Sequence, residues 1–336
     1  MDPPLKIAHL PLDSPFLLAP MAGFTDSAFR RICRRLGAGL VFTEMASVEG
    51  LRRRSDKTLH YLEAGPEERP VAGHLYGADP DAFAEAAAVA ESLGRFDLID
   101  INCGCPVPKI ARKGAGAALL RDPGKIEAIV KAVRRSCRLP VTVKTRPGTD
   151  PARPRIRETL RAVEDGGGAA IIVHGRWGRD RHQGEADWEL IAEIRAAAAI
   201  PVIGNGGIES AGEAREKLRR FRVDGVMIGR AAIGNPWIFA EAKSLLEGKP
   251  FIPPVPEKRY RVIVEHLEGL YRSKVAEARI RRRDPARTGN AACREFYGHL
   301  AGYLAGTPGL GELKRKVAHL ESPRDLLDRV AAVLRV

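Results

Sequence analysis

Short apolar runs recur through the first two-thirds of the chain, and each is followed by a stretch with helically spaced apolar residues. The runs are rich in Val, Ile, Leu and Ala without polar alternation, which is typical of parallel strands buried on both faces. They lie at residues 16–19, 40–43, 71–75, 98–102, 141–144, 170–174, 202–204 and 225–228. The helical stretches lie at residues 26–35, 48–62, 80–93, 123–138, 154–165, 187–198, 211–220 and 236–246. Eight strand-then-helix units predict a (β/α)8 TIM barrel of the α/β class rather than an open sheet.

The pattern changes near Gly248. Four prolines between residues 250 and 256 form a linker, and from about residue 257 the chain has helical spacing to its end. The sequence therefore predicts two domains, a barrel at residues 1–248 and a small all-helical domain at residues 249–336.

Composition narrows the class of protein. The 336 residues are 44% hydrophobic and 29% charged, which excludes a disordered or fibrous chain. The formal charge of +13 fits a polyanionic partner or a phosphorylated ligand; a charge spread evenly for solubility is the alternative. No apolar stretch reaches the roughly 20 residues that cross a membrane, and the N-terminus lacks the features of a signal peptide. We expect a cytoplasmic protein that does not bind a membrane.

The five cysteines are odd in number and scattered, which argues against a disulfide framework. Cys103 and Cys105 are two apart, but no second Cys/His pair with zinc spacing follows, so we expect no metal. Cys105 lies in a predicted loop between Gly104 and Pro106, where a thiol is a candidate acid or nucleophile. Strand periodicity turns Cys103 toward packing. The residues alone leave a catalytic role for Cys105 open.

Active sites of such barrels lie at the carboxyl ends of the strands. The loops after the seventh and eighth predicted strands carry Gly206-Gly207 and Gly229-Arg230, where small residues let backbone N–H groups approach an anion, so we expect a phosphate site. Lys144 closes an otherwise apolar strand, which is costly unless it meets a negative partner. It would suit the electron-rich ring of a reduced flavin; a lysine reaching solvent at the barrel rim is the alternative.

Five motifs together resemble those of tRNA-dihydrouridine synthases. They lie at residues 19–26 (APMAGFTD), 100–106 (DINCGCP), 141–146 (VTVKTR), 173–176 (VHGR) and 227–232 (MIGRAA). The similarity runs in order from about residue 17 to 239 and continues more weakly to residue 316. The element at residues 102–106 with the basic residues after it is not shared by barrel enzymes in general. Within the family, the chain most resembles the bacterial branch sometimes called nitrogen-regulation-like.

The resemblance implies an FMN-dependent oxidoreductase that uses NADPH to saturate the 5,6 double bond of a uridine in the D-loop of tRNA. It implies Cys105 as the proton donor, tRNA as the partner and no metal. The implied cofactor-binding residues are Pro20, Met21, Ala22, His74, Lys144, His174, Asn205, Gly207, Gly229 and Arg230. The implied substrate-binding residues are Asn102, Arg176 and His182.

The chain departs from the family pattern at three places. His74 stands where the third strand usually offers Gln, and His182 replaces an aromatic residue that contacts the base in some members. In the tail, Tyr297-Gly298 replaces a basic pair and Gly302 replaces a tryptophan. Other arginines of the tail could supply the positive charge, or could form a solvated basic face; they are Arg279, Arg281, Arg282, Arg283, Arg287 and Arg294.

Two other readings compete with a tRNA-modifying enzyme. An FMN enzyme acting on a small substrate, of a dihydroorotate or enoate type, is disfavoured by the helical tail and the +13 charge. An RNA-binding protein without catalysis is disfavoured because Cys105, Lys144 and His174, the residues implied for catalysis and cofactor binding, are all present. The sequence predicts neither the oligomeric state nor which uridine is reduced.

Overall fold

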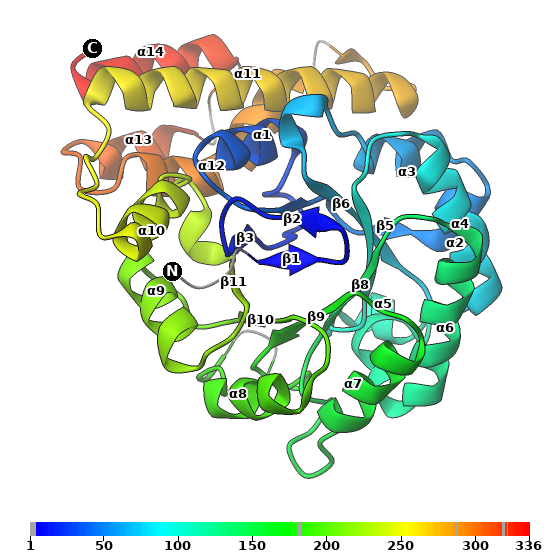
Figure 1. Cartoon of the computed structure of the whole chain (residues 1–336). Coiled ribbons are helices and arrows are strands. Elements are labelled where there is room, and N and C mark those ends of the chain that lie inside the picture. The colour runs from blue at the N-terminus through cyan, green and yellow to red at the C-terminus, as the bar shows by residue number, and fades with distance from the viewer. Residues whose placement is uncertain (1–4, 181–182, 286–287, 318–319, 321) are drawn as a thin grey trace.

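A computed structural model describes residues 5–180, 183–285, 288–317, 320 and 322–336. In this part of the chain, eight parallel strands form a ring in the order β3-β11-β10-β9-β8-β7-β6-β4 (Figure 1). Their bounds are β3 (Phe16–Leu18), β4 (Val41–Phe42), β6 (Val71–Tyr76), β7 (Leu98–Asn102), β8 (Val141–Thr145), β9 (Ala170–His174), β10 (Val202–Asn205) and β11 (Gly225–Ile228). The Leu18 N–H donates to Leu40 O at 3.0 Å, and this hydrogen bond closes the ring between β3 and the start of β4. The predicted barrel is confirmed.

Helices surround the ring. They are α1 (Ser27–Arg35), α2 (Val48–Arg52), α3 (Asp56–Tyr61), α4 (Pro80–Ser92), α6 (Pro123–Ser136), α7 (Ile156–Asp165), α8 (Trp188–Ala197), α9 (Ala211–Arg220) and α10 (Ile238–Glu247). Shorter elements are β5 (Ala46–Ser47), which pairs with β6, α5 (Pro108–Ala111), and the 3-10 turns η1 (Pro66–Glu68), η2 (Gly116–Arg121) and η3 (Arg230–Ala232). Side chains cap the first turns of α1, α4, α6, α8 and α9, as Asp and Ser do at helix starts.

The single helix predicted at residues 48–62 is wrong, because the chain turns sharply between α2 and α3. Arg54 takes a left-handed conformation in this turn, with a φ of 49°. The turn brings the backbone of Gly50 directly against the Thr58 side chain, with no room for a Cβ on the glycine. Packing between the two short helices therefore overrides the continuous helical spacing.

A hairpin that the sequence pattern did not predict closes the amino-terminal end of the barrel. It consists of β1 (Lys6–Ile7) and β2 (Leu10–Pro11). Ile7 is fully buried and packs with the side chains that fill the barrel interior, among them Phe42 and Met227. Because this end is closed, a ligand has access at the opposite end of the barrel.

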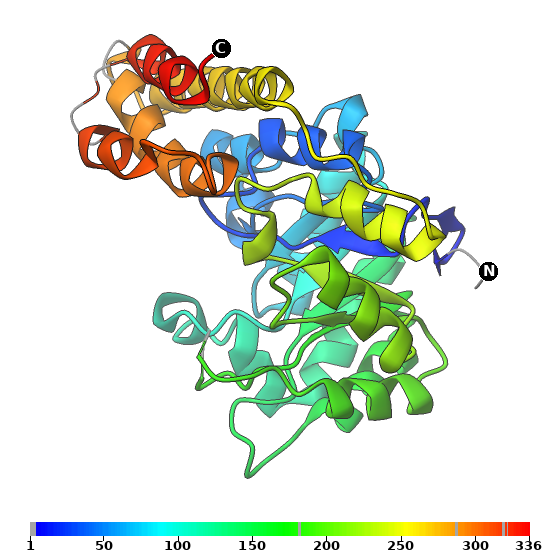
Figure 2. The same ribbon diagram turned by 90° about the vertical axis from the view of Figure 1, so that its left-hand side faces the viewer.

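The C-terminal region is helical, as predicted, and packs on one side of the barrel. It contains α11 (Pro256–Ile280), α12 (Thr288–Tyr303), α13 (Leu310–Val317) and α14 (Pro323–Leu334). Figure 2 shows it extending past the barrel on the side away from the N-terminus. Its apolar cluster includes Ile32 of α1 and Trp237 just before α10. Whether residues 249–336 form a separate domain stays a prediction.

The arginines at residues 281–283 are not helical, contrary to the pattern. Helix α11 ends at Ile280, and Arg282 has a φ of 53° in the turn that follows. Arg281 pairs with Glu277 at 2.5 Å, whereas Arg282 and Arg283 are exposed. In the described part of the chain, no helix is both long and apolar enough to cross a membrane.

Candidate functional site

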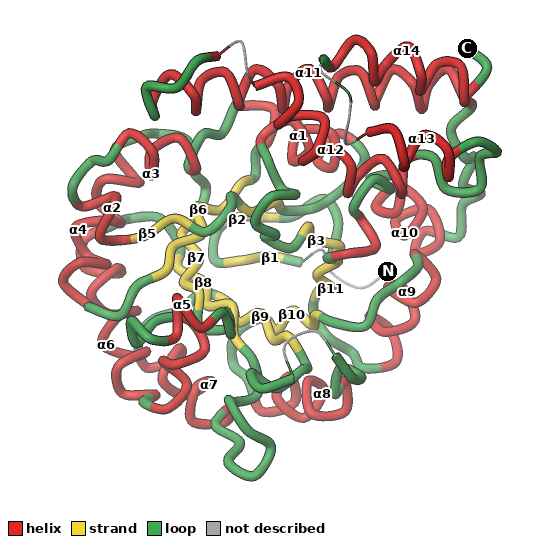
Figure 3. The backbone as a smooth tube through the Cα atoms, turned by 180° about the vertical axis from the view of Figure 1, so that it is seen from behind, coloured by secondary structure: helices red, strands yellow, loops and turns green. Residues whose placement is uncertain are grey.

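A pocket of about 730 Å³ opens at the carboxyl ends of the strands, the end seen in Figure 3. This volume is in the range of small-molecule and cofactor sites. Every predicted site residue that the structure describes lines it: Pro20, Met21, Ala22, His74, Asn102, Cys105, Lys144, His174, Arg176, Asn205, Gly207, Gly229 and Arg230. His182 lies outside the described residues. Strand register explains the convergence, because Asn102 of β7 pairs with Lys144 of β8 and His174 of β9 pairs with Asn205 of β10.

The Cys105 loop is held by the side chain of Asn102. The Asn102 Oδ1 atom accepts from the Gly104 N–H at 3.1 Å and from the Cys105 N–H at 2.9 Å. Partial burial raises the pKa of the Cys105 thiol, and a hydrogen bond with the Val107 backbone and then the charges of Arg146 and Lys144 oppose this only in part. The thiol is therefore protonated at neutral pH and lines the pocket.

Cys103 is fully buried in the core between strands and helices, as the periodicity predicts.

A buried relay fixes the orientation of Asn102. The Asp100 carboxylate is 2.6 Å from His74 Nδ1, and His74 Nε2 is 3.0 Å from Asn102 Nδ2. A carboxylate can only accept, so Nδ1 carries the proton and Nε2 accepts from the Asn102 amide. This leaves Asn102 Oδ1 facing the Cys105 loop. Both ring nitrogens of His74 have hydrogen-bond partners, so His74 lines the pocket without offering a free nitrogen to a ligand.

Lys144 lies in the pocket with its ammonium near an amide. Its Nζ donates to Asn205 Oδ1 at 3.1 Å, and Asn205 Nδ2 donates to Met227 O at 2.7 Å, which sets the orientation of the amide. Burial, and then the charge of Arg146, lower the pKa of Lys144 to about 8. Among the described residues Lys144 forms no ion pair with a carboxylate, and a buried ammonium without such a partner fits a site for an anionic or electron-rich ligand.

Arg146 is a pocket residue that sequence reasoning did not assign. Its guanidinium donates to Gly104 O at 2.9 Å and to the carbonyl oxygens of Arg176 and Trp177 at 3.1 and 3.0 Å. It thereby ties the loop after β7 to the loop after β9. Its spacing of two from Lys144 is a signal that could have identified it, because residues two apart share a face of a strand.

The loops after β10 and β11 form a cradle with positive charge. Gly206 and Gly207 have φ values of 115° and 64°, which favour glycine. Arg176 and Arg230 both line the pocket, and the charge of Arg230 adds to burial in lowering the pKa of Arg176. Neither guanidinium forms an ion pair with a carboxylate of the described residues. Two arginines beside glycine backbone are suited to bind an anion such as phosphate.

Comparison with known proteins identifies the family. The sequence profile of the family described as dihydrouridine synthase (Dus) matches residues 17–335, nearly the whole chain. The chain belongs to the dihydrouridine synthase family.

Related members cover the chain over most of its length. The tRNA-dihydrouridine synthase B of Pseudomonas aeruginosa is 38% identical over 319 residues, which is 94% of this chain and 92% of the relative. The tRNA-dihydrouridine synthase B of Xanthomonas campestris is 42% identical over 256 residues, 76% of this chain and 77% of the relative. The five motifs that carry the resemblance all lie within the matched residues 17–335.

The fold of this Dus family member is also similar to a solved structure. Histamine dehydrogenase from Rhizobium sp. 4-9 superposes with a TM-score of 0.50 at 16% sequence identity, covering 79% of this chain and 50% of that one. At this identity the likeness concerns the fold alone.

Proposed function

We propose that this chain is a tRNA-dihydrouridine synthase, which reduces the 5,6 double bond of a uridine in the tRNA D-loop with FMN as cofactor and NADPH as reductant. The observation that carries the proposal is that the Cys105 thiol lines one pocket with Lys144 and Asn102, and partial burial there raises the pKa of the thiol. The names of the relatives from Pseudomonas and Xanthomonas support the substrate class. The assignment to the bacterial, nitrogen-regulation-like branch is part of this proposal and rests on the sequence resemblance alone.

The pocket residues fit FMN. Arg230 has no acidic partner among the described residues, and a Cβ on Gly207 or Gly229 would meet no atom closer than 3.7 Å, which leaves their backbone open to a phosphate. Lys144 would hold the polar edge of the ring, with His174 and His74 lining the same pocket. Pro20, Met21 and Ala22 supply a wall from the loop after β3. When bound, a reduced flavin supplies hydride to carbon 6 of the uracil.

Cys105 completes the reduction. Saturating the 5,6 bond takes one hydride at carbon 6 and one proton at carbon 5, and the Cys105 thiol supplies that proton. An acid for this step must be protonated at neutral pH and close to the base, and the raised pKa of Cys105 meets the first condition. Asn102 holds the loop in place, and Asn102 and Arg176 would contact the uracil from the pocket wall.

The target uridine must leave the folded tRNA to reach a pocket this deep, as enzymes that act on bases generally require. The helical region at residues 249–336 would bind phosphates and sugars while the barrel holds one base. The exposed Arg282 and Arg283, and the exposed Lys109, Arg112 and Lys113 next to Cys105, supply positive charge. A tRNA substrate places the enzyme in the cytoplasm.

Changing Arg281, Arg282 and Arg283 together to alanine should weaken tRNA binding. Each lost phosphate contact lowers the salt slope of binding by roughly one unit. We expect a raised KM for tRNA and unchanged flavin reduction by NADPH, measured with tRNA titrations at two salt concentrations.

A matched control changes Arg134, Arg135 and Arg138, which are exposed at the end of the barrel opposite to the pocket. An unchanged slope in the first triple variant would place the RNA elsewhere, on Lys109, Arg112 and Lys113.

Changing His74 to leucine should slow tRNA reduction about tenfold, because Asn102 loses the acceptor that orients it and the Cys105 loop is released. FMN should still bind. His74→Gln should restore most of the rate, since glutamine offers both a donor and an acceptor. The measurement is the rate at which tRNA reoxidises NADPH-reduced enzyme. A fully active His74→Leu variant would show that the relay does not position Cys105.

A half-reaction assay tests the proposed function. The purified protein is loaded with FMN, reduced with NADPH without oxygen, and mixed with unmodified tRNA, free uridine or a small enone. We expect tRNA to reoxidise the flavin while free uridine and the enone do not, and the tRNA product should contain dihydrouridine. Reoxidation by a small substrate with no tRNA binding would favour the small-substrate enzyme, and no flavin binding would favour a non-catalytic RNA-binding protein.

A further inference from the structure

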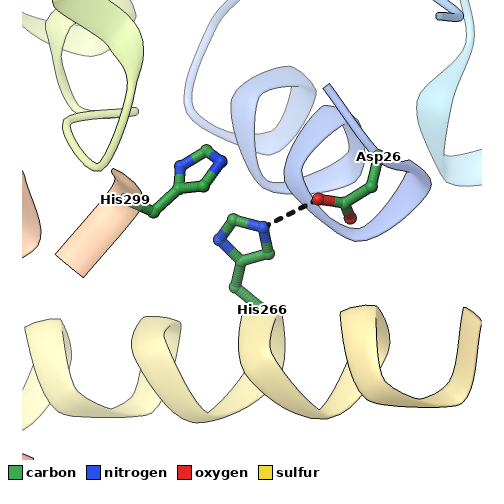
Figure 4. Close-up of side chains that lie close together, drawn as sticks. All are labelled: Asp26, His266 and His299. Atoms are coloured by element: carbon green, nitrogen blue, oxygen red, sulfur yellow. Dashed lines mark hydrogen bonds and ion pairs between the residues drawn. The ribbon is translucent and has the colours of Figure 1, made fainter. Parts of the chain in front are cut away.

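Three titratable side chains from different elements meet between the barrel and the helical region. Asp26 comes from the loop before α1, His266 from α11 and His299 from α12, and one potential ligand atom of each lies within 4.8 Å of the others (Figure 4). Two imidazoles and a carboxylate are residue types that bind transition metals. The cluster lies outside the pocket described above.

The hydrogen bonds of the cluster argue against a metal. His299 Nδ1 accepts from the Gly234 N–H at 3.1 Å, and His299 Nε2 is 3.1 Å from Phe24 O. His266 Nε2 is 3.0 Å from Asp26 Oδ2, and His266 Nδ1 is 2.9 Å from the Tyr303 hydroxyl. Each ring nitrogen therefore already has a partner, and a metal ion would have to displace them.

The environment of His299 favours its neutral form. Burial, and then the neighbouring His266, lower the pKa of His299 to about 3. A neutral imidazole has one donor and one acceptor, which match the Phe24 carbonyl and the Gly234 N–H. His299 thus makes two specific hydrogen bonds to backbone, both in loops of the barrel.

The two partners of His299 belong to two pocket loops against which α12 packs. Phe24 lines the pocket in the loop after β3, together with Pro20 and Met21. Gly234 follows η3 in the loop after β11, and its neighbour Ile233 lines the pocket as Arg230 does. Because β3 and β11 are adjacent in the barrel, one imidazole from α12 bridges both loops.

Glycines make this contact close. A Cβ on Gly298 would overlap the Phe24 ring, and one on Gly302 would overlap the Ile233 carbonyl. Gly234 has a φ of 66°, and a Cβ there would overlap the backbone of His299. Helix α12 therefore lies directly on both pocket loops, and a shift of this helix cannot occur without moving them.

We propose that His299 is a positioning residue that holds the Phe24 and Gly234 loops together, so that the helical region shapes the cofactor pocket from outside it. His299 does not touch the cofactor; it acts through the two loops. The identity of the ligand as FMN rests on the proposed function.

The test compares FMN binding by His299→Leu with that by a matched control. Leucine leaves the buried Gly234 N–H and the partly buried Phe24 carbonyl unpaired, so we expect the FMN dissociation constant of the apoprotein to rise at least about tenfold. Cys293→Ala is the control, because Cys293 is equally buried on α12 and its side chain makes no hydrogen bond to either loop. It should lower the thermal midpoint yet change the dissociation constant less than about twofold. An unchanged constant in His299→Leu, or an equal rise in Cys293→Ala, would overturn the proposal.

A second variant and a hydrogen-exchange measurement test the role of His299 even if His299→Leu does not fold. His299→Asn retains an acceptor for Gly234 and loses the bond to Phe24, so it should give an intermediate rise if His299→Leu does not fold. Amide hydrogen exchange of the ligand-free protein should quicken in residues 20–24 and 229–234 of the His299 variants and stay unchanged in α4. If the parent binds no FMN, the proposed function fails, while the exchange result still decides the role of His299. Unchanged exchange in both loops would refute it.

Discussion

Replacing Cys105 with alanine should slow the reduction of tRNA on the order of a hundredfold or more, because a positioned proton donor is lost. Flavin reduction by NADPH should continue at the parent rate, since that half-reaction needs no proton from Cys105. Rapid mixing of reduced enzyme with unmodified tRNA, followed by flavin absorbance, measures the affected step alone. Cys105→Ser should be similarly slow, because a hydroxyl is a far weaker acid than a thiol.

Cys103→Ala is the matched control for this prediction. Cys103 is two residues away, but it is fully buried and packs in the core rather than lining the pocket. Its loss should cost about 1 kcal/mol of stability and leave the rate of tRNA reduction near that of the parent. The assignment of the acid would be reversed if Cys103→Ala were inactive and Cys105→Ala retained its rate.

Changing Lys144 to methionine should weaken FMN binding about tenfold to a hundredfold, because a hydrogen bond to a charged group contributes about 1.5–3 kcal/mol. Methionine keeps an unbranched apolar side chain in the pocket and removes only the charge. Fluorescence titration of the apoprotein with FMN measures the effect. Lys131→Met, which removes an exposed lysine of α6, is the control and should bind FMN as the parent does.

The same residue predicts a pH dependence. Burial lowers the pKa of Lys144 from 10.5 to about 8, so the side chain is charged below this pH and neutral above it. The affinity of the parent for FMN should therefore fall as the pH rises from about 7 to 9. In Lys144→Met that fall should disappear. An affinity of the parent that rises over this range would contradict a charged lysine at the cofactor.

The barrel could be predicted because buried parallel strands leave contiguous apolar runs. The predicted bounds of β7, β9 and β11 agree with the structure at both ends. The hairpin of β1 and β2 could not be predicted in this way, since strands of two residues have no periodicity. The break in residues 48–62 depends on the contact of Gly50 with Thr58, which exists only after the chain has folded.

The candidate site could be predicted because a barrel brings the ends of all its strands together. Lys144 and Cys105 are conspicuous in the sequence, as a charge and a thiol after apolar runs. Asp100 is not, because it lies inside an otherwise apolar strand and its role depends on His74 from the neighbouring strand. The role proposed for His299 depends on the placement of α12 against loops far away in the chain, which no local pattern encodes.

Mapping dihydrouridine in the tRNA of living cells decides whether this chain makes that base. The chain is expressed in a strain that lacks all dihydrouridine synthase activity, and the tRNA is sequenced by a method that detects dihydrouridine. We predict dihydrouridine at a defined D-loop position with the parent and none with Cys105→Ala expressed at the same level. If the base is absent with the parent, in cells that contain folded and flavin-loaded protein, this chain is not a tRNA-dihydrouridine synthase.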